Sequence, residues 1–468
     1  MTRAAVGRGG RAAVAAGVAD AGLASLATFA VGLFAIRALE PRTLGAYALA
    51  FTAFNLLAVV PAQLLFVPAE TVATGFPRAR RAGLAAHSLR AGVPAAALAA
   101  LVLPAWLLGA PPGIPRPALL ALTATAAACT LLSPVQDHLR RMLHVAGRSK
   151  GAALVSAIQC AAVAAAVLFA LRLGIEDAWI PFGALAAANA LSLGAGLLLL
   201  RGAEDGAAPP ELGAGALARS GRWLLLAGVI GPASAFAAAG VAAHLGGAEA
   251  LGFAEAARVI GHPVLVLATG LSAVLGPRSV RAARARDRVE ARRVAVRFQA
   301  LTLAGGAAWL ALVSVDWALN PFPELVPRAF AVGGVAAAAI LAAMVNGAVF
   351  PGRSELLGAG RAGSIARADS AGGALRVGIA GTAGATGVFA VPLGFLALGL
   401  VRWAGYRRAL APVYAPEERD VIRGNGIPLR TRRRWSRWRN GGWPRRSADA
   451  PSTLRGHDCW WGEEARER

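Results

Sequence analysis

The chain has 468 residues, of which 56% are hydrophobic and 16% are charged, and its formal net charge is +23. Soluble domains contain about 45–50% apolar and about 25% charged residues, so an ordinary soluble protein is excluded and a polytopic, all-α membrane protein is predicted. Nearly all of the positive charge comes from arginines between the apolar runs, where the expected partner is anionic membrane lipid rather than nucleic acid.

Apolar runs long enough to cross a bilayer recur along the chain. A hydrocarbon core of roughly 30 Å needs about 20 apolar residues per helix. On this basis the sequence predicts twelve transmembrane helices, at 12–36, 46–67, 84–108, 117–138, 151–171, 179–200, 223–244, 252–275, 297–316, 328–349, 369–385 and 387–408. The run at 369–385 is the weakest because Arg376 and several glycines dilute it, and ten spans plus a broken hairpin also fit.

Short motifs indicate that the second half of the chain repeats the first. The pair Leu44-Gly45 at the start of the second span recurs as Leu251-Gly252 at the start of the eighth. We therefore predict two six-helix bundles in the same order and orientation, which is a parallel repeat. The first covers 1–200 and the second 221–410, and a Gly- and Pro-containing cytoplasmic linker at 201–220 joins them.

The arginines also predict the orientation in the membrane. They concentrate in alternate loops, most densely at 278–297, so the positive-inside rule places the even-numbered loops and both termini in the cytoplasm. The expected location is the plasma (inner) membrane. Residues 411–468 are predicted to form a basic, disordered cytoplasmic tail, although their Arg and Trp mixture also suits the inner leaflet surface. Pro61, Pro232 and Pro263 are expected to break or kink the second, seventh and eighth spans.

Three segments resemble a known group of transporters. LEPRTLGAYAL at 39–49, the stretch 245–260 and QDHLRRMLHVAGRSK at 136–150 are similar to motifs of the multidrug/oligosaccharidyl-lipid/polysaccharide (MOP) exporter superfamily. Within it, the polysaccharide flippases that move undecaprenyl-diphosphate-linked sugars are the most similar. The resemblance spans 1–408 and implies two bundles around a central cavity. Helices 1, 2, 7 and 8 would line this cavity, which would open alternately to either side.

Ionised side chains within the predicted spans mark the candidate site, because each costs about 2.5–3.5 kcal/mol at the centre of a helix. Glu255, Arg258 and His262 are spaced by three and four residues, so they share one helical face. Asp20 is predicted to lie at a similar depth in the first span. If the first and eighth spans face one cavity, these four residues form a single polar site. Asn55 takes the position in the repeat that corresponds to His262.

Two roles are open for this group. In the first, Arg258 binds the diphosphate of the carrier lipid, helped by His262 and Asn55. A proton or sodium ion that drives the cycle would then bind Asp20, Glu255 or His262. In the second role, Glu255 and Arg258 only neutralise one another. Arg90 is a further substrate-binding candidate, although snorkelling to the interface also explains it.

These features predict a flippase that moves lipid-linked oligosaccharide, a polyprenyl-diphosphate sugar, across the plasma membrane by alternating access. It would serve polysaccharide biosynthesis beside glycosyltransferases and a polymerase. A cation-coupled multidrug antiporter of the same fold is the alternative, but a central arginine would repel cationic drugs. A cell-wall precursor flippase would be expected to have two extra helices.

An enzyme is the alternative from another class. A membrane glycosyltransferase or ligase would need an acidic pair on an external loop, for which Asp316 and Glu324 are the candidates. We find no catalytic signature, no metal-ligand spacing and no cofactor motif in the sequence.

Overall fold

The computed structural model describes residues 3–110, 113–201, 209–315, 317, 320, 323, 326–330 and 332–415, and every regular element in these ranges is a helix. The described helices belong to one compact unit that ends at Tyr414. Asp316, Glu324, most of the predicted linker (202–208) and the predicted tail beyond Ala415 lie outside the described residues.

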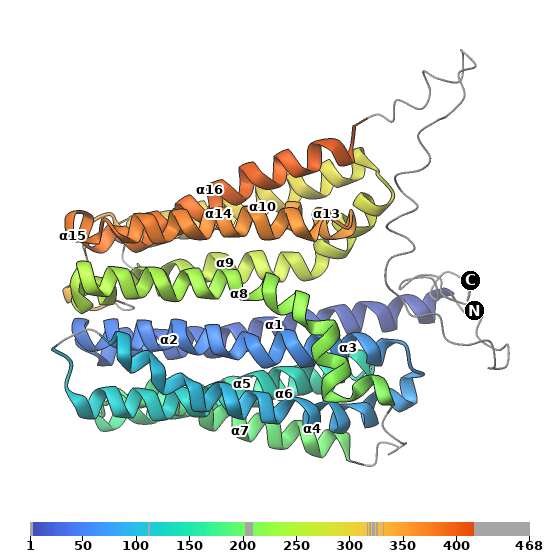
Figure 1. Ribbon diagram of the computed structural model, residues 1–468, viewed down its shortest axis with the longest axis horizontal. Helices are drawn as coiled ribbons and strands as arrows, with labels where there is room; N and C mark the ends of the chain where they lie inside the picture. Colours follow the sequence, from blue (N-terminus) through green and yellow to red (C-terminus); the bar gives the residue numbers. More distant parts are fainter. Residues whose placement is uncertain are drawn as a thin grey trace. The chain divides into compact units, whose positions relative to one another are not determined.

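The first half of the chain forms seven α-helices, which lie side by side in Figure 1. They are α1 (Arg3–Ala38), α2 (Pro41–Pro61), α3 (Val67–Thr74), α4 (Arg78–Val102), α5 (Arg116–Val145), α6 (Ser149–Leu173) and α7 (Ile180–Leu200). A π-helical turn, η1 (Ala62–Phe66), joins α2 to α3, and a 3-10 helix, η2 (Leu103–Gly109), extends α4. Pro61 therefore ends the regular part of the second span, as predicted.

The second half forms a further set of helices. They are α8 (Ala214–Leu245), α9 (Gly247–Arg284), α10 (Arg288–Ser314), α12 (Val335–Ala348), α13 (Phe350–Gly358), α14 (Ala362–Ala380), α15 (Ala383–Thr386) and α16 (Ala390–Leu410). Pro232 and Pro263 lie inside helices that stay continuous, α8 and α9. The helix α8 begins at Ala214, so its first two turns occupy the end of the predicted linker.

Each of the twelve predicted spans coincides with a helix. Among the described residues, eleven helices are long and apolar enough to cross a membrane. The helix that is not one of the eleven is α14, the predicted eleventh span, which packs against α8 and α16. It carries Asp369 and Arg376 along its 19 residues, and these charges lower its apolar character.

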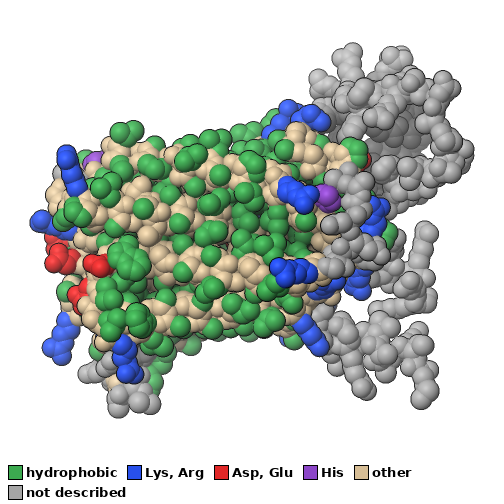
Figure 2. All heavy atoms as spheres, turned by 90° about the horizontal axis from the view of Figure 1, so that it is seen from below, with side chains coloured by type: hydrophobic (Ala, Val, Ile, Leu, Met, Phe, Trp, Pro, Cys, Tyr) green, Lys and Arg blue, Asp and Glu red, His purple; other side chains and the backbone are tan. Residues whose placement is uncertain are grey.

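The outer surface of the helices suits a bilayer. Large apolar side chains such as Leu101, Leu168, Phe169 and Leu191 are more than half exposed along the spans. Figure 2 shows a broad apolar band, with charged side chains gathered at the two ends of the molecule. Such a band would be unfavourable in water and is matched by lipid, so the chain is a multi-pass membrane protein.

Two glycines let α2 and α9 cross in direct backbone contact near their first turns. A Cβ atom at Gly45 would overlap the carbonyl of Ala248, and one at Gly252 would overlap the carbonyl of Pro41. The contact is reciprocal because Leu44-Gly45 and Leu251-Gly252 are equivalent positions of the repeat. The two halves are therefore held tightly together at this end of the molecule, which is the end opposite the arginine-rich loops.

Candidate functional site

The predicted pair on α9 is present. Arg258 donates two hydrogen bonds to the Glu255 carboxylate, from Nε at 2.7 Å and from Nη2 at 2.6 Å. The two partners differ in exposure, with 5% of the Glu255 side chain and 34% of the Arg258 side chain accessible. The carboxylate is thus buried behind the guanidinium group, part of which remains accessible.

An aromatic cluster on α2 and α7 supports the guanidinium group. Arg258 lies 5.0 Å above the centre of the Phe51 ring, within the range of a cation–π interaction. Phe51 in turn contacts Tyr47, Phe54 and Phe182. The Arg258 head therefore lies between Glu255 of its own helix, α9, and Phe51 of α2.

His262 and Asn55 lie close to this pair along the chain. His262 stacks on Phe29 of α1, with ring centres 6.4 Å apart, so it belongs to the seam between α1 and α9. Asn55 is one turn beyond Phe51 on α2 and donates to the Phe51 carbonyl at 2.8 Å. Of the predicted substrate-binding residues, the structure places Arg258, His262 and Asn55 on neighbouring surfaces of α2 and α9.

Two more arginines extend the positive charge. Arg376 of α14 lies 5.4 Å from the centre of the Phe395 ring, and its buried Nε has no hydrogen-bond partner among the described residues. Arg402 of α16 donates to Asp369 at 2.9 Å. The charges that act on Arg376 are those of Arg402 and Arg258, and no described carboxylate is paired with it.

We call Arg258, Arg376 and Arg402 the arginine cluster. Its three cations are accompanied by two buried carboxylates, Glu255 and Asp369, which leaves a formal charge of one positive unit (three minus two). A buried guanidinium group without a carboxylate partner is costly unless an anion neutralises it. The cluster is therefore suited to bind an anion such as a phosphate or diphosphate.

Asp20 lies in a different group, the Asp20 network. Its carboxylate accepts hydrogen bonds from Ser156 at 2.6 Å and Arg140 at 3.0 Å, and His144 Nε2 is also 3.0 Å away. Arg140 also donates to Asp137 at 2.8 Å. The network joins α1, α5 and α6, and the Asp20 side chain is only 8% exposed.

The expectation that Asp20 shares one site with Glu255, Arg258 and His262 is therefore corrected. A Cβ atom at Gly32 of α1 would contact Val259, so Gly32 marks the level of Arg258 on α1. Asp20 precedes Gly32 by twelve residues, which is roughly 18 Å along a helix at 1.5 Å per residue.

Arg90 is not brought to the arginine cluster either. It is exposed on α4, and no hydrogen bond, ion pair or ring contact joins it to Arg258, Arg376 or Arg402 among the described residues. A second buried group lies near it instead. His138 Nδ1 donates to the Glu70 carboxylate at 3.0 Å, and its Nε2 lies 2.7 Å from the Ser88 hydroxyl. This group ties α3, α4 and α5 together.

Sequence reasoning missed Arg402 and Asp369 at the arginine cluster, and Arg140, His144 and Ser156 around Asp20. Arg402 and Asp369 carried the same signal as Arg258, an ionisable residue inside a predicted span. Arg140 lies near the end of the fourth predicted span and donates to Asp20. No local pattern links residues that are 120 positions apart.

The fold is similar to those of several solved membrane transporters. The chain is similar to a multidrug resistance MATE family transporter of the MOP superfamily in its inward-facing conformation, with a TM-score of 0.67 and 15% identity over 83% of this chain and 95% of that chain. It is also similar to the lipid II flippase MurJ in an inward closed conformation, with a TM-score of 0.58 and 10% identity over 85% and 87% of the two chains.

A third neighbour has a TM-score of 0.55 and 15% identity over 86% of this chain and 96% of its own. It is a MOP superfamily transporter from Pyrococcus furiosus, described as having a binding pocket of reverse polarity that suggests a different function. No family model and no curated protein matches the chain. The chain has the fold of MOP superfamily transporters, a fold that serves multidrug transporters and a lipid flippase, and the predicted resemblance is confirmed at this level.

Proposed function

We propose that the protein is a flippase for an anionic lipid-linked oligosaccharide, a polyprenyl-diphosphate sugar, and that the arginine cluster binds its diphosphate. The observation that carries the proposal is the excess of cations at the cluster. No described carboxylate is paired with Arg376, and the positive charges of Arg258 and Arg402 act on it. A diphosphate offers several acceptor oxygens to guanidinium donors, and each charge-assisted hydrogen bond contributes about 1.5–3 kcal/mol.

The route of the substrate follows from the packing. The reciprocal glycine contact holds α2 and α9 together at one end, so the substrate would be loaded from the arginine-rich end. By the positive-inside rule that end would be cytoplasmic and both termini would lie in the cytoplasm. The membrane we propose is the plasma membrane. The bundles 1–200 and 221–410 would then rock against each other to release the sugar outside, where a polymerase and glycosyltransferases complete the polysaccharide.

The Asp20 network supports a proposal for the driving force. Asp20 is buried between α1, α5 and α6 and bonds to two groups that carry or can gain a proton, Arg140 and His144. Protonation of Asp20 would release both partners and change how α1 packs on α5 and α6. Glu255 is less suited to this role, because both of its oxygens already accept bonds from Arg258.

The proposal is tested by reconstituting the protein in liposomes with a fluorescent polyprenyl-diphosphate oligosaccharide in the inner or outer leaflet. Flipping should be fast with the native chain and should fall about 10- to 100-fold in Arg258→Gln and in Arg376→Gln, the loss expected for one or two charge-assisted bonds. Arg408→Gln, at an exposed arginine in the last turn of α16, is the matched control. Flipping that is unchanged in both cluster variants would contradict the proposal.

A multidrug antiporter is the second candidate, because the solved neighbours include MATE transporters and Asp20 is a buried carboxylate in the first span. It predicts uptake of a cationic dye against a proton or sodium gradient in the same liposomes. The net positive charge of the arginine cluster disfavours this substrate class.

A further inference from the structure

A cavity beside the arginine cluster has no assigned role in the proposed transport, although Tyr406 in its wall donates at 2.7 Å to Asp369, the partner of Arg402. It has a volume of about 320 Å³ and is lined by residues of α10, α12, α13 and α16, among them Gln299, Glu355, Trp403, Tyr406 and Arg407. This volume is at the lower end of the range found for small-molecule sites. Such a cavity suits a headgroup rather than a complete lipid.

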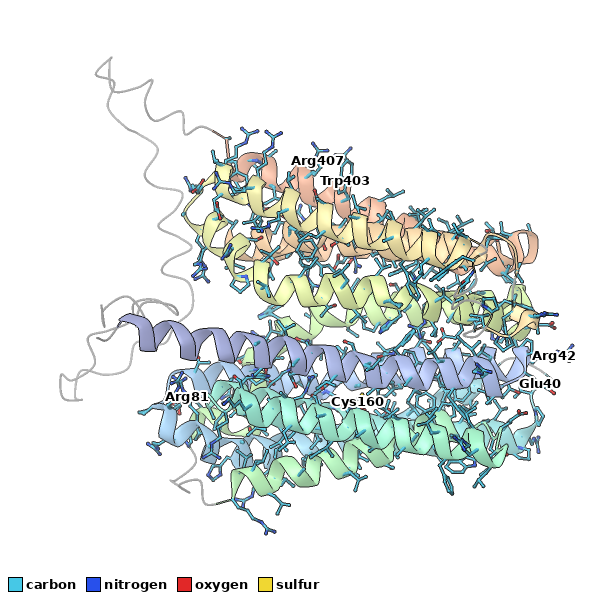
Figure 3. The ribbon with its side chains drawn as sticks, turned by 180° about the vertical axis from the view of Figure 1, so that it is seen from behind. Glu40, Arg42, Arg81, Cys160, Trp403 and Arg407 are labelled. Carbon is cyan, nitrogen blue, oxygen red and sulfur yellow. The ribbon has the colours of Figure 1, made fainter. Side chains whose placement is uncertain are left out.

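One wall of the cavity carries an available cation. The Arg407 guanidinium lies 4.7 Å from the centre of the Trp403 ring, and no described carboxylate is paired with it. Trp403 is 44% exposed. Figure 3 shows both labelled side chains at the edge of α16 that points away from α1, the side where lipid would be. An arginine and a tryptophan near the end of a membrane helix match the depth of phospholipid headgroups.

The cavity is also lined by a buried carboxyl group. Glu355 is 5% exposed and accepts a hydrogen bond from the Tyr414 hydroxyl at 2.9 Å. Burial, followed by the neighbouring Glu355 carboxylate, raises the pKa of Tyr414, so the phenol stays protonated and remains a donor. No described Lys, Arg or His forms an ion pair with Glu355, and Glu355 lines the cavity.

A carboxylate and a guanidinium that line one cavity without pairing with each other are complementary to a zwitterion. Gln299 adds a neutral acceptor, because its Nε2 donates to the Ala348 carbonyl at 3.2 Å and its Oε1 remains open. A primary ammonium group donates three hydrogen bonds and matches Glu355 and Gln299, whereas a trimethylated ammonium donates none. An anionic headgroup would be repelled by Glu355.

We propose that this cavity binds the headgroup of a zwitterionic phospholipid with a primary ammonium, with its phosphate on Arg407 and its ammonium on Glu355 and Gln299. The acyl chains would lie along the exposed side of α16. The site would link the C-terminal helices to the lipid leaflet at the arginine-rich end.

Native mass spectrometry of the full chain in detergent tests this site. The purified protein is mixed with equal amounts of phosphatidylethanolamine, phosphatidylcholine and phosphatidylglycerol that have identical acyl chains. Phosphatidylethanolamine should be retained about tenfold more than the other two, the effect of roughly one charge-assisted bond. Equal retention of the three lipids would overturn the proposal.

Three variants locate the binding to the cavity. Glu355→Gln, which still accepts from Tyr414, should remove the preference for phosphatidylethanolamine over phosphatidylcholine. Arg407→Gln should weaken the binding of phosphatidylethanolamine and of phosphatidylcholine. Arg408→Gln, on the same turn of α16 but outside the cavity, should change neither. A preference that persists in Glu355→Gln overturns the proposal. So does a preference seen only after residues 416–468 are deleted, which would identify the chain's own tail as the occupant.

Discussion

Gly45 of α2 and Gly252 of α9 are equivalent residues of the two halves, and each lies directly against a backbone carbonyl of the other helix. This pair sets the distance between the halves at the end opposite the arginine-rich loops. A side chain at either position has to be accommodated by moving a whole helix, since the neighbour is backbone rather than a flexible side chain.

We therefore expect Gly45→Leu to separate α2 and α9 at this end and to favour the conformation that is open there. The readout is labelling of Asn55→Cys by a membrane-impermeant thiol reagent, in a variant whose three native cysteines are serines. In Gly45→Leu, labelling from the side opposite the arginine-rich loops should increase several-fold. Gly240→Leu on α8 is the control, because a Cβ atom at Gly240 meets nothing within 4 Å. Equal labelling in both variants would contradict the role of the glycine pair.

Arg376 and Arg402 should differ in their effects on stability. Arg402→Gln leaves Asp369 buried without its cation, so the free energy of unfolding should fall by about 3–5 kcal/mol. Arg376→Gln removes a cation that has no carboxylate partner, so stability should be kept while diphosphate-lipid binding weakens about tenfold. Thermal unfolding in detergent and binding titrations separate the two effects. A strongly destabilised Arg376→Gln would point to a structural role instead.

Asp20→Asn should make flipping independent of the proton or sodium gradient while substrate still binds. The physical reason is that the amide keeps the size of the side chain and cannot exchange a proton. Asp137→Asn is the matched control, because Asp137 also pairs with Arg140 but its side chain is 45% exposed. Flipping rates with and without an imposed gradient give the answer. If Asp20→Asn still responds to the gradient, the coupling group lies elsewhere.

The predicted tail is tested by truncation. A chain that ends at Ala415 keeps the Tyr414 hydroxyl on Glu355 and should flip lipid at the native rate. Tyr414→Phe in the full chain should lower the free energy of unfolding by about 1–3 kcal/mol, because a buried carboxylate loses its described donor. Loss of flipping on truncation alone would show that residues 416–468 take part in transport.

The sequence was informative where a property is local. The length of an apolar run decides whether it spans a membrane, so all twelve predicted spans coincide with helices. The Glu255 and Arg258 pair was also predictable, since residues three apart on a helix face one another. The partners of Asp20 were not predictable, because Ser156 and Arg140 are 136 and 120 residues away from it in the sequence and lie on other helices. Only the packing angles of α1, α5 and α6 determine that contact.

The π-helical turn after Pro61 has a consequence for how α2 meets its neighbours. One additional residue in a helical turn rotates everything that follows by about 100°. Before the turn, α2 presents Gly45 to α9; within it, the Leu64 carbonyl meets Gly221 of α8. The second span therefore contacts α9 near its start and α8 at the π-helical turn, so an insertion or deletion in that turn would shift the contact between Leu64 and Gly221.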